Sequence, residues 1–384
     1  MSATALEKLC SMCGLCMVKA WSAKEAVQGC VFTTGWLGSK EQAVFGRERA
    51  SDGSAEMLFG ISLERFVARM KNPLPDIQFT GIITSIAKKA FETGLVDAVV
   101  TLHRSKEDYF LPVPVLAQTL TSLEKACQQG IKKLLVIGAS CHVQNLREFQ
   151  RRSHYLRDID LFVVGIPCTD NVHPNHFRSI FSKISRSHET VRHYEFMQDF
   201  TVHLRHVDGT LERVPFFSLP QDINSAELVT ACCRSCFDYM NGLADITVGY
   251  IGAPLDIEKM YQWVLVRTEK GEELRQLIAD ELETYPETSD GDRTALVGQY
   301  ALRYTKDGAA EARKMSGSMP LEQGFMLAEH MYTTGPRGLE FVRYAIETHV
   351  IRNYYFVKQN YPEKLLALVP GYVYSVLEAY GLEP

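Results

Sequence analysis

KKLLVIGASCHVQNLREFQ (residues 132–150) and DLFVVGIPC (residues 160–168) are the part of the chain that decides its fold. Each contains a continuous apolar run of the kind that buried parallel strands carry. The first run leads directly into a helix-like segment. Upstream, residues 81–94 place apolar side chains at helical spacing and end at a glycine, residues 96–104 are strand-like, and residues 120–130 form another helical pattern that ends at a glycine. Helices that alternate with apolar strands in this way predict an α/β layer built on a parallel sheet.

The sequence on either side of this layer has a different character. Residues 1–75 contain scattered Gly, Ser and charged residues, and we expect an irregular N-terminal arm. Residues 191–220 resemble alternating strands around an Asp208-Gly209 turn, and amphipathic helices are predicted over residues 272–285 and 340–361. The predicted segments are therefore an N-terminal arm (1–75), an α/β layer (76–190), and a C-terminal part with a β-rich stretch and helices (191–384).

Two cysteines follow the predicted strands of the α/β layer. Cys141 comes directly after the first apolar run and Cys168 directly after the second. Because ligands of open α/β sheets bind at the carboxyl ends of the strands, we expect both thiols to reach one edge of the sheet. The alternative is that each cysteine is a small buried hydrophobic residue at a strand end.

Three further cysteines near the N-terminus have a spacing typical of electron-transfer proteins. Cys10, Cys13 and Cys16 in LCSMCGLC form the C-x-x-C-x-x-C pattern that binds an iron-sulfur cubane. Zinc sites more often take separated C-x-x-C pairs, so iron is favoured over zinc, and unliganded thiols in a flexible segment are a third alternative. Another C-x-x-C pair occurs at Cys233 and Cys236. We therefore predict an electron-transfer protein whose residues 1–75 form a cluster-binding arm.

The overall composition excludes several classes of protein. The chain has 384 residues, of which 46% are hydrophobic and 23% charged, as expected for a soluble protein of two or three domains. A formal net charge of -5 argues against a nucleic-acid binder. No apolar run reaches the roughly 20 residues that span a bilayer, and the first ten residues lack the features of a signal peptide. We therefore expect a cytoplasmic protein whose association with membranes, if any, is peripheral, and the oligomeric state stays open, a homo-oligomer included.

Several longer strings of the sequence resemble a known family. The chain is similar, from Leu9 to about Tyr361, to the iron-sulfur flavoprotein branch of the deazaflavin-dependent hydrogenase and dehydrogenase beta-subunit family, and within it to the ferredoxin-dependent reductases of chlorophyll metabolism. The strings that carry this resemblance are LCSMCGLC, FTGIITSIA, SCHVQNLR, PCTDNV, HYEFMQDF, VPFFSLP, CRSCFDYMNGLADITVGYIG and GPRGLEFVRYAIETHVIRNY.

This resemblance implies cofactors, partners and ligands. It implies FAD, two four-iron four-sulfur (4Fe-4S) clusters, reduced ferredoxin as electron donor and a magnesium tetrapyrrole as substrate. Two such clusters need eight thiolates. The residues that match the family strings are Cys10, Cys13, Cys16, Cys30, Cys141, Cys168, Cys233 and Cys236. Of the ten cysteines, Cys127 and Cys232 are left over, and the division of the eight between the clusters stays open.

The flavin cannot bind through an ordinary phosphate loop, because the sequence contains neither a Walker lysine motif nor G-x-G-x-x-G. The start of the helix at Thr80 and Gly81 is the better candidate, since free N–H groups at a helix N-terminus bind phosphate and Thr84 adds a hydroxyl. Taken alone, a Thr before a helix is usually only a helix cap. The residues that follow the two strand-end cysteines are further candidates for flavin contacts: Gln144, Asn145, Asp170 and Asn171.

The predicted reaction is a two-electron reduction of a tetrapyrrole substituent. We expect reduction of the 8-vinyl group of divinyl chlorophyllide or protochlorophyllide to ethyl, because YQWVLVRTEKG (residues 261–271) resembles the bacterial branch and no transit extension precedes the first cysteines. There are three alternatives. The protein could reduce 7-hydroxymethyl chlorophyll a, it could be an electron-relay subunit of a deazaflavin-dependent hydrogenase or dehydrogenase, or it could be a non-enzymatic protein with two zinc sites.

For the proton donor, the sequence offers candidates without deciding among them. His193, Glu195 and Asp199 alternate along a predicted strand and would share one face, although solvated strand positions are the more common explanation for such residues. Asp238 and Asp245, beside the second C-x-x-C pair, are either acids or helix-capping residues.

Overall fold

The computed structural model describes residues 30, 35, 37–75, 77–101, 116–152, 158–170, 174–220, 229–305 and 318–384. Four of the predicted site residues, Cys10, Cys13, Cys16 and Asn171, lie outside this described part of the chain.

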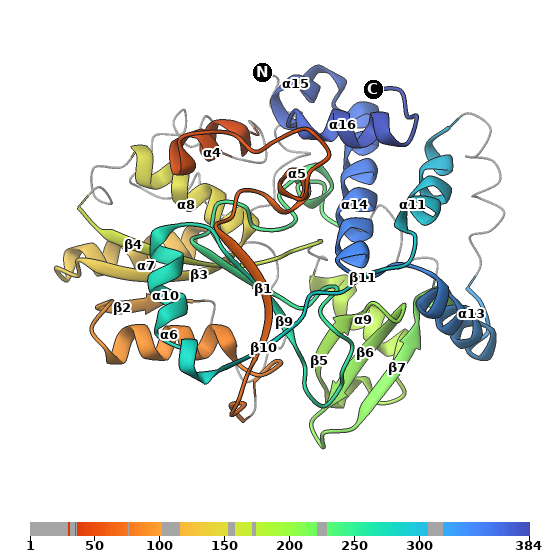
Figure 1. Cartoon of the computed structure of the whole chain (residues 1–384), viewed down its shortest axis with the longest axis horizontal. Coiled ribbons are helices and arrows are strands. Elements are labelled where there is room, and N and C mark those ends of the chain that lie inside the picture. The colour runs from red at the N-terminus through yellow and green to blue at the C-terminus, as the bar shows by residue number, and fades with distance from the viewer. Residues whose placement is uncertain are drawn as a thin grey trace.

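A seven-stranded sheet with the order β10-β1-β9-β8-β4-β3-β2 forms the centre of the molecule (Figure 1). Its strands are β1 (Glu64–Met70), β2 (Ala98–Val100), β3 (Lys133–Ala139), β4 (Asp160–Ile166), β8 (Ile246–Gly249), β9 (Gln262–Val266) and β10 (Leu282–Tyr285). Strands β2, β3, β4 and β8 are parallel neighbours, while β9 runs antiparallel between β8 and β1. The predicted α/β layer with a parallel sheet is confirmed. Strands from all three predicted segments contribute to the sheet, so the boundaries at residues 75 and 190 do not divide it.

Helices cover both faces of this sheet, which explains the continuous apolar runs. On β3, Leu134 packs into the core cluster shared with α7 (Leu116–Gln128) and α8 (Ser140–Arg152), whereas Leu135 packs into the cluster shared with α6 (Ile82–Glu92) and α10 (Glu269–Gln276). Successive side chains of a strand point to opposite faces, so a strand buried on both sides needs apolar residues at every position.

The N-terminal part is more ordered than expected. Residues 37–70 form α4 (Leu37–Phe45), α5 (Ala55–Phe59) and strand β1, which lies inside the sheet between β9 and β10. The prediction of an irregular arm up to residue 75 is therefore wrong for these residues. The sequence of β1 does not look like a buried strand because it contains Arg65 and Arg69. The strand tolerates these charges because Arg65 pairs with Glu287 at 2.9 Å and Arg69 with Glu283 at 3.9 Å.

The predicted β-rich segment is a separate three-stranded sheet. It consists of β5 (Val191–Phe196), β6 (Thr201–His206) and β7 (Leu211–Pro215), and α9 (Pro174–Ile184) precedes it. Gly209 has a φ of +84° in the turn between β6 and β7, where Asp208 accepts the backbone N–H of Thr210. The predicted Asp208-Gly209 turn is confirmed.

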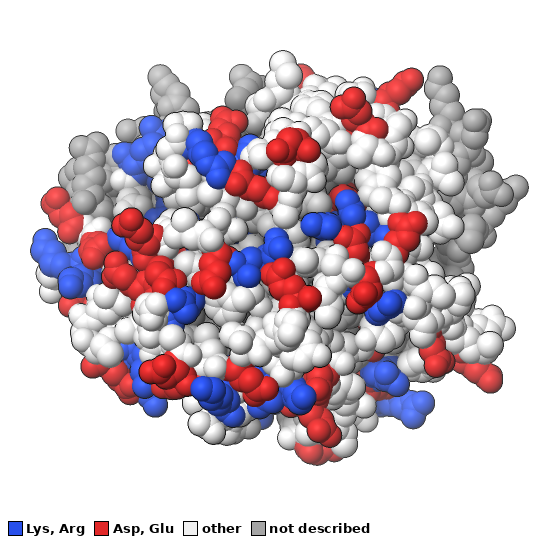
Figure 2. Space-filling model, viewed as in Figure 1, with Lys and Arg blue, Asp and Glu red and all other residues white. Residues whose placement is uncertain are grey.

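The C-terminal part is mainly helical. Its elements are β11 (Ser289–Asp290), α11 (Arg293–Ala301), α13 (Leu321–Thr334), β12 (Arg337–Gly338), α14 (Leu339–Asn360), α15 (Leu365–Leu368) and α16 (Tyr372–Ala379). The helix expected over residues 272–285 ends at Gln276 with α10, because Leu282–Tyr285 pairs with β1 as strand β10. No helix of the described residues is long and apolar enough to cross a membrane. On the face shown in Figure 2, acidic and basic side chains are intermixed.

Candidate functional site

The carboxyl ends of the parallel strands bring two cysteines together at one edge of the sheet. Ala139, the last residue of β3, is aligned with Ile166, the last residue of β4. Cys141 lies in the first turn of α8, and Cys168 follows β4 by two residues. The thiols are close enough for a charge on Cys168 to raise the pKa of Cys141. The register of β3 and β4 therefore positions both side chains.

The second C-x-x-C pair completes a four-cysteine set at this edge. Cys233 begins the short 3-10 turn Cys233–Ser235, and Cys236 follows it. Any two of the following four cysteines lie within electrostatic reach of each other: Cys141, Cys168, Cys233 and Cys236. We call these four residues the edge cysteines.

Two other cysteines border the edge cysteines. Cys232 is 1% exposed, and Cys30, Cys141 and Cys233 pack against it. Its sulfur lies 3.0 Å from the Thr230 hydroxyl. Cys30, whose neighbours in the sequence are mostly outside the described residues, thus approaches the edge cysteines from the N-terminal side.

The edge cysteines are a candidate donor set for a metal centre. Burial raises the pKa of Cys141 and Cys236, and nearby thiols add to this effect. Buried thiolates without a cation would repel one another, so the thiols stay protonated until a metal centre binds. Within the described ranges, no three His, Cys, Asp or Glu side chains are close enough to hold a single metal ion. A four-iron cubane binds four cysteines at separate iron atoms, so the set fits such a cluster better than one Zn²⁺.

Helix α14 holds the backbone of the second C-x-x-C pair. The fully buried Asn353 donates from Nδ2 to the carbonyl oxygens of Cys233 at 2.9 Å and Cys236 at 2.6 Å. Burial lowers the pKa of His349 to about 3, so its neutral imidazole donates from Nε2 to the Cys236 carbonyl at 3.0 Å. Neither Asn353 nor His349 was predicted from the sequence. Their spacing of four places them on one helix face, but nothing in the sequence relates that face to the cysteines.

The same helix also holds the loop that carries Cys168. Arg352 forms two parallel hydrogen bonds with the carboxylate of Asp170, at 2.7 and 2.8 Å. Burial raises the pKa of Asp170, and Arg352 opposes this effect. A bidentate, charge-assisted pair of this kind fixes both geometry and charge. Asp170, predicted as a flavin contact, therefore has a partner within the protein.

We expect Asn353→Leu to loosen the metal site. The substitution removes one hydrogen bond from each of two carbonyl oxygens, which keep a second donor in His349 and in the backbone N–H of Cys236. Each lost bond contributes about 0.5–1.5 kcal/mol to the free energy of unfolding. Bound iron should then be lost faster to a chelator than from the unsubstituted protein. Asn360→Leu is the matched control, because Asn360 lies at the exposed end of the same helix and bonds only the Phe356 carbonyl. Equal iron loss from the two variants would contradict the role of Asn353.

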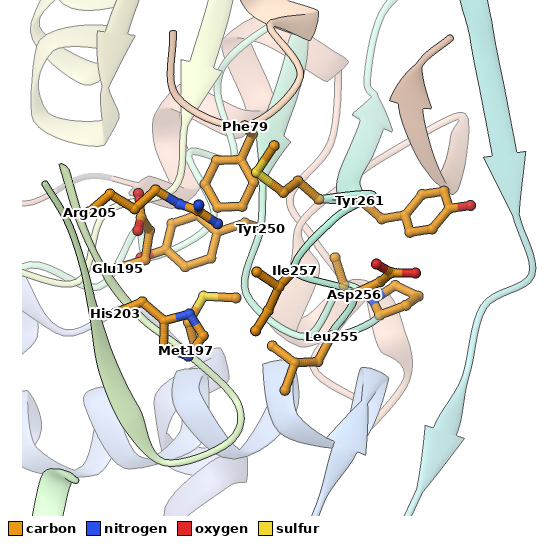
Figure 3. A pocket seen from close by; sticks show the side chains of 13 residues that line it. Phe79, Glu195, Met197, His203, Arg205, Tyr250, Leu255, Asp256, Ile257 and Tyr261 are labelled. Carbon is orange, nitrogen blue, oxygen red and sulfur yellow. The ribbon is translucent and has the colours of Figure 1, made fainter. Parts of the chain in front are cut away.

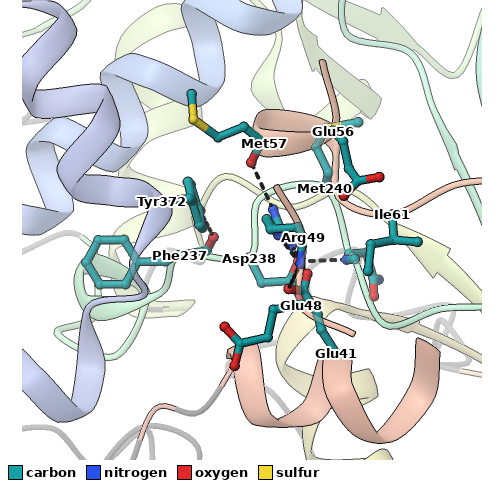
Figure 4. Close-up of polar contacts among 12 residues, drawn as sticks. Glu41, Glu48, Arg49, Glu56, Met57, Ile61, Phe237, Asp238, Met240 and Tyr372 are labelled. Atoms are coloured by element: carbon teal, nitrogen blue, oxygen red, sulfur yellow. Dashed lines mark hydrogen bonds and ion pairs between the residues drawn. The ribbon is translucent and has the colours of Figure 1, made fainter. Parts of the chain in front are cut away.

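A buried polar network surrounds Asp238, which follows Cys236 by two residues (Figure 4). Asp238 accepts a hydrogen bond from Gln144 at 3.1 Å. The buried Arg49 pairs with Glu41 at 2.6 Å and lies over the ring of Tyr372 at 4.9 Å. Gln144, predicted as a flavin contact, is thus engaged with Asp238. The Asp238 carboxylate itself is part of the scaffold, and so is Asp245, which accepts the backbone N–H of Val163 at 2.7 Å.

The loop before α6 has the features of a phosphate-binding turn. Thr80 is buried and its hydroxyl accepts the backbone N–H of Met70 at 3.0 Å, so this hydroxyl fixes the loop to β1. Gly81 has a φ of +87°, and a Cβ there would lie 2.4 Å from the Ile77 side chain. No side chain caps the helix, and Thr84 is exposed in its first turn. The N–H groups of this turn are therefore free of intrahelical acceptors.

One predicted flavin contact has an unused polar atom. Asn145 is 2% exposed and donates from Nδ2 to the Cys141 carbonyl at 2.7 Å. Its Oδ1 has no hydrogen-bond partner among the described residues. A buried acceptor without a donor points to a ligand group, and together with the loop at Gly81 it is compatible with a flavin at this edge.

A hollow opens between the three-stranded sheet and the loop after β8 (Figure 3). Glu195, His203 and Arg205 project into it from β5 and β6, opposite the aromatic rings of Phe79 and Tyr250. The two rings are stacked with their centroids 4.8 Å apart. Because Phe79 immediately precedes Thr80, the hollow adjoins the candidate phosphate-binding turn.

Two carboxyl groups, one in the hollow and one behind it, have pKa values shifted in opposite directions. Burial raises the pKa of Glu195, although Gln78 donates to its carboxyl at 2.8 Å. His203 lies opposite Glu195 in the strand pair, with Nε2 2.9 Å from Asp199. Burial opposes ionisation of Asp199, but hydrogen bonds from His203 and Thr201 outweigh it and lower the pKa. His203 was not predicted from the sequence.

The predicted candidates His193, Glu195 and Asp199 occupy three different surroundings. Glu195 lines the hollow, and Asp199 lies in the turn before β6, behind His203. His193 lies two residues before Glu195 on β5, opposite Arg205. A buried tyrosine connects the hollow with the edge cysteines, because Tyr239 is within electrostatic reach of both Cys168 and Tyr250.

Comparisons with known proteins agree with this architecture. The family model "Coenzyme F420 hydrogenase/dehydrogenase, beta subunit N-term" matches residues 65–130, and the family model for the C terminus of the same beta subunit matches residues 131–290. An uncharacterized protein of Nostoc sp. is 37% identical over 98% of this chain and 94% of its own length. The 7-hydroxymethyl chlorophyll a reductase of Oryza sativa subsp. japonica is 35% identical over 97% of this chain and 82% of its own length. A solved chain of the F420-reducing nickel-iron hydrogenase complex from Methanosarcina barkeri superimposes with a TM-score of 0.50 and 20% identity. The match covers 73% of this chain and 97% of that one, and this likeness supports the fold alone.

Proposed function

Because the chain belongs to the coenzyme F420 hydrogenase/dehydrogenase beta-subunit family, we propose that it is an iron-sulfur flavoprotein that reduces a substituent of a magnesium tetrapyrrole with electrons from ferredoxin. The observation that carries this proposal is the set of four partly buried edge cysteines at the sheet edge. The rice relative, a chlorophyll reductase by name, supports a tetrapyrrole as substrate.

The 8-vinyl group of divinyl chlorophyllide is the substituent that we propose first. Residues 261–271 support it through their likeness to the bacterial branch of the family. The second candidate is 7-hydroxymethyl chlorophyll a, which the identity to the rice enzyme favours. Conversion of vinyl to ethyl consumes two electrons and two protons. Conversion of hydroxymethyl to methyl consumes the same and releases water, so both reactions make the same demands on the protein.

For the cofactors, we propose that the edge cysteines hold one 4Fe-4S cluster and that Cys10, Cys13, Cys16 and Cys30 hold the other. The mutual electrostatic reach of the four edge cysteines supports their assignment to one cluster. The turn at Thr80 and Gly81, with the unused Oδ1 of Asn145, would hold FAD. When bound, such clusters pass single electrons and a flavin stores two of them and delivers a hydride.

The protein's own contribution to the reaction is the proton that accompanies the hydride. Asp199 holds Nε2 of His203, which leaves Nδ1 for the hollow. No described residue forms a hydrogen bond with that nitrogen. We assign His203 as the proton donor through Nδ1, and Asp199 as the residue that orients it. Glu195, whose pKa burial raises, is the second group that can donate a proton into the same space.

Parallel assays of the reconstituted protein test the proposed function. Under anaerobic conditions with reduced ferredoxin, we expect divinyl chlorophyllide to be reduced to its ethyl form, followed by absorption and chromatography. Reduction of 7-hydroxymethyl chlorophyll a alone would replace the first candidate by the second. Turnover of neither pigment, with rapid electron transfer from ferredoxin to a deazaflavin, would identify an electron-relay subunit and contradict the proposal.

A further inference from the structure

Two residues that line the hollow next to the candidate phosphate-binding turn have a strained backbone conformation. Phe79 and Met260, which both line it, have φ values of +55° and +52°. Bulky residues pay about 1–3 kcal/mol each for this left-handed conformation, and such residues concentrate at binding and catalytic sites. Packing around the hollow therefore holds its walls in a fixed shape, as a preformed ligand site requires.

Arg205 is the unusual residue in this hollow. It is partly buried, and its guanidinium has neither a hydrogen bond nor an ion pair with any described residue. Neighbouring arginines are paired: Arg213 lies 3.7 Å from Asp199, and Arg352 binds Asp170 at 2.7 Å. Glu195 lies within electrostatic reach of Arg205, but its carboxyl accepts its hydrogen bond from Gln78 and not from the guanidinium. A guanidinium that forms no hydrogen bond with any described residue matches a carboxylate of a ligand in both charge and shape.

The other walls of the hollow select a flat, apolar ligand body. The stacked rings of Phe79 and Tyr250 lie opposite the strand pair that carries Arg205, and Ile257 adds an aliphatic surface. Two carboxyl groups also line the hollow, those of Glu195 and Asp256. Arg205 is the one arginine among its described lining residues. Aromatic and aliphatic walls beside an arginine suit a conjugated ring system with an acidic side chain.

We infer that the hollow binds the ionised carboxylate of the tetrapyrrole, with Arg205 as its anchor. The inference rests on the proposed function and makes it more specific, since it selects the free-acid form of the pigment over its esters. An ester offers no negative charge to the guanidinium, and its alcohol chain would compete for the same space. Arg205 is thus a specificity-determining residue that lies in the same hollow as the proposed proton donor.

Binding measured without turnover tests this inference. The oxidised, cofactor-loaded protein is titrated anaerobically with divinyl chlorophyllide and with its methyl ester, and pigment fluorescence is followed. We expect the free acid to bind about 10- to 100-fold more tightly, because a charge-assisted hydrogen bond is worth about 1.5–3 kcal/mol. Arg205→Gln should abolish this preference and leave binding of the ester unchanged, whereas Arg205→Lys should retain part of it.

Arg186→Gln is the matched control, because Arg186 is exposed beside the same three-stranded sheet and does not line the hollow. It should keep the full preference for the acid. Equal affinity of the unsubstituted protein for acid and ester would overturn the inference, and so would a preference that survives Arg205→Gln or a loss of flavin in that variant. Preferential binding of the acid without any reduction would support the binding site and contradict the reductase function, so the two proposals fail separately.

Discussion

Replacing Cys168 by serine is expected to remove about half of the iron bound per chain and to abolish reduction of the pigment. Cys168 is separated from the N-terminal cysteines by most of the α/β layer, yet it belongs to the edge cysteines through the register of β3 and β4. A serine hydroxyl replaces a thiolate poorly as a ligand of iron. The cluster assigned to Cys10, Cys13, Cys16 and Cys30 should remain. Iron and sulfide analysis, together with electron paramagnetic resonance of the reduced protein, measures this result.

Two serine variants of cysteines outside the ligand set are the controls. Cys232 is buried directly beside Cys233 and tests whether any thiol at this place would serve, while Cys127 lies on α7. Cys232→Ser and Cys127→Ser should keep the full iron content. If Cys232→Ser lost as much iron as Cys168→Ser, Cys232 would be a ligand and the proposed set would be incorrect.

The sequence predicted the parts of this site that depend on local pattern. Cys141 and Cys168 follow apolar strands, and parallel strands always expose their carboxyl ends at one edge, so their proximity required no further information. The approach of Cys233 and Cys236 to that edge depends instead on hydrogen bonds from Asn353 on α14, more than a hundred residues later. Contacts between such distant segments leave no periodic signal in a single sequence.

Strand pairing also explains why strand β1 and the residues of the hollow could not be predicted from the sequence. Strand β1 was not recognised because its arginines are paired across the sheet, which conceals a buried strand behind charged residues. His203 and Arg205 alternate along β6 like residues on a solvated strand face. They are enclosed only because the loop after β8 lies against them, and its conformation depends on strained residues such as Met260.

Replacing His203 by glutamine is expected to reduce turnover by about 10²- to 10⁴-fold, which is the usual contribution of a positioned proton donor. Iron content, flavin content and pigment binding should stay unchanged, since His203 touches none of the edge cysteines. His206→Gln is the matched control. His206 lies on the same strand, is also buried and also has a carboxylate partner, Glu212 at 3.3 Å, but it does not line the hollow.

Asp199→Asn separates proton donation by His203 from a merely structural role. Burial opposes ionisation of Asp199, but hydrogen bonds lower its pKa, and its carboxylate lies 2.9 Å from Nε2 of His203. Asparagine preserves the shape of this side chain but removes its charge, so the imidazole loses its charged acceptor. We expect Asp199→Asn to show part of the loss of turnover expected for His203→Gln, while iron content, flavin content and pigment binding stay unchanged. If Asp199→Asn leaves turnover unchanged, or if Glu195→Gln rather than His203→Gln abolishes turnover, the proton comes from another group, and the buried carboxyl of Glu195 is then the donor that the hollow offers.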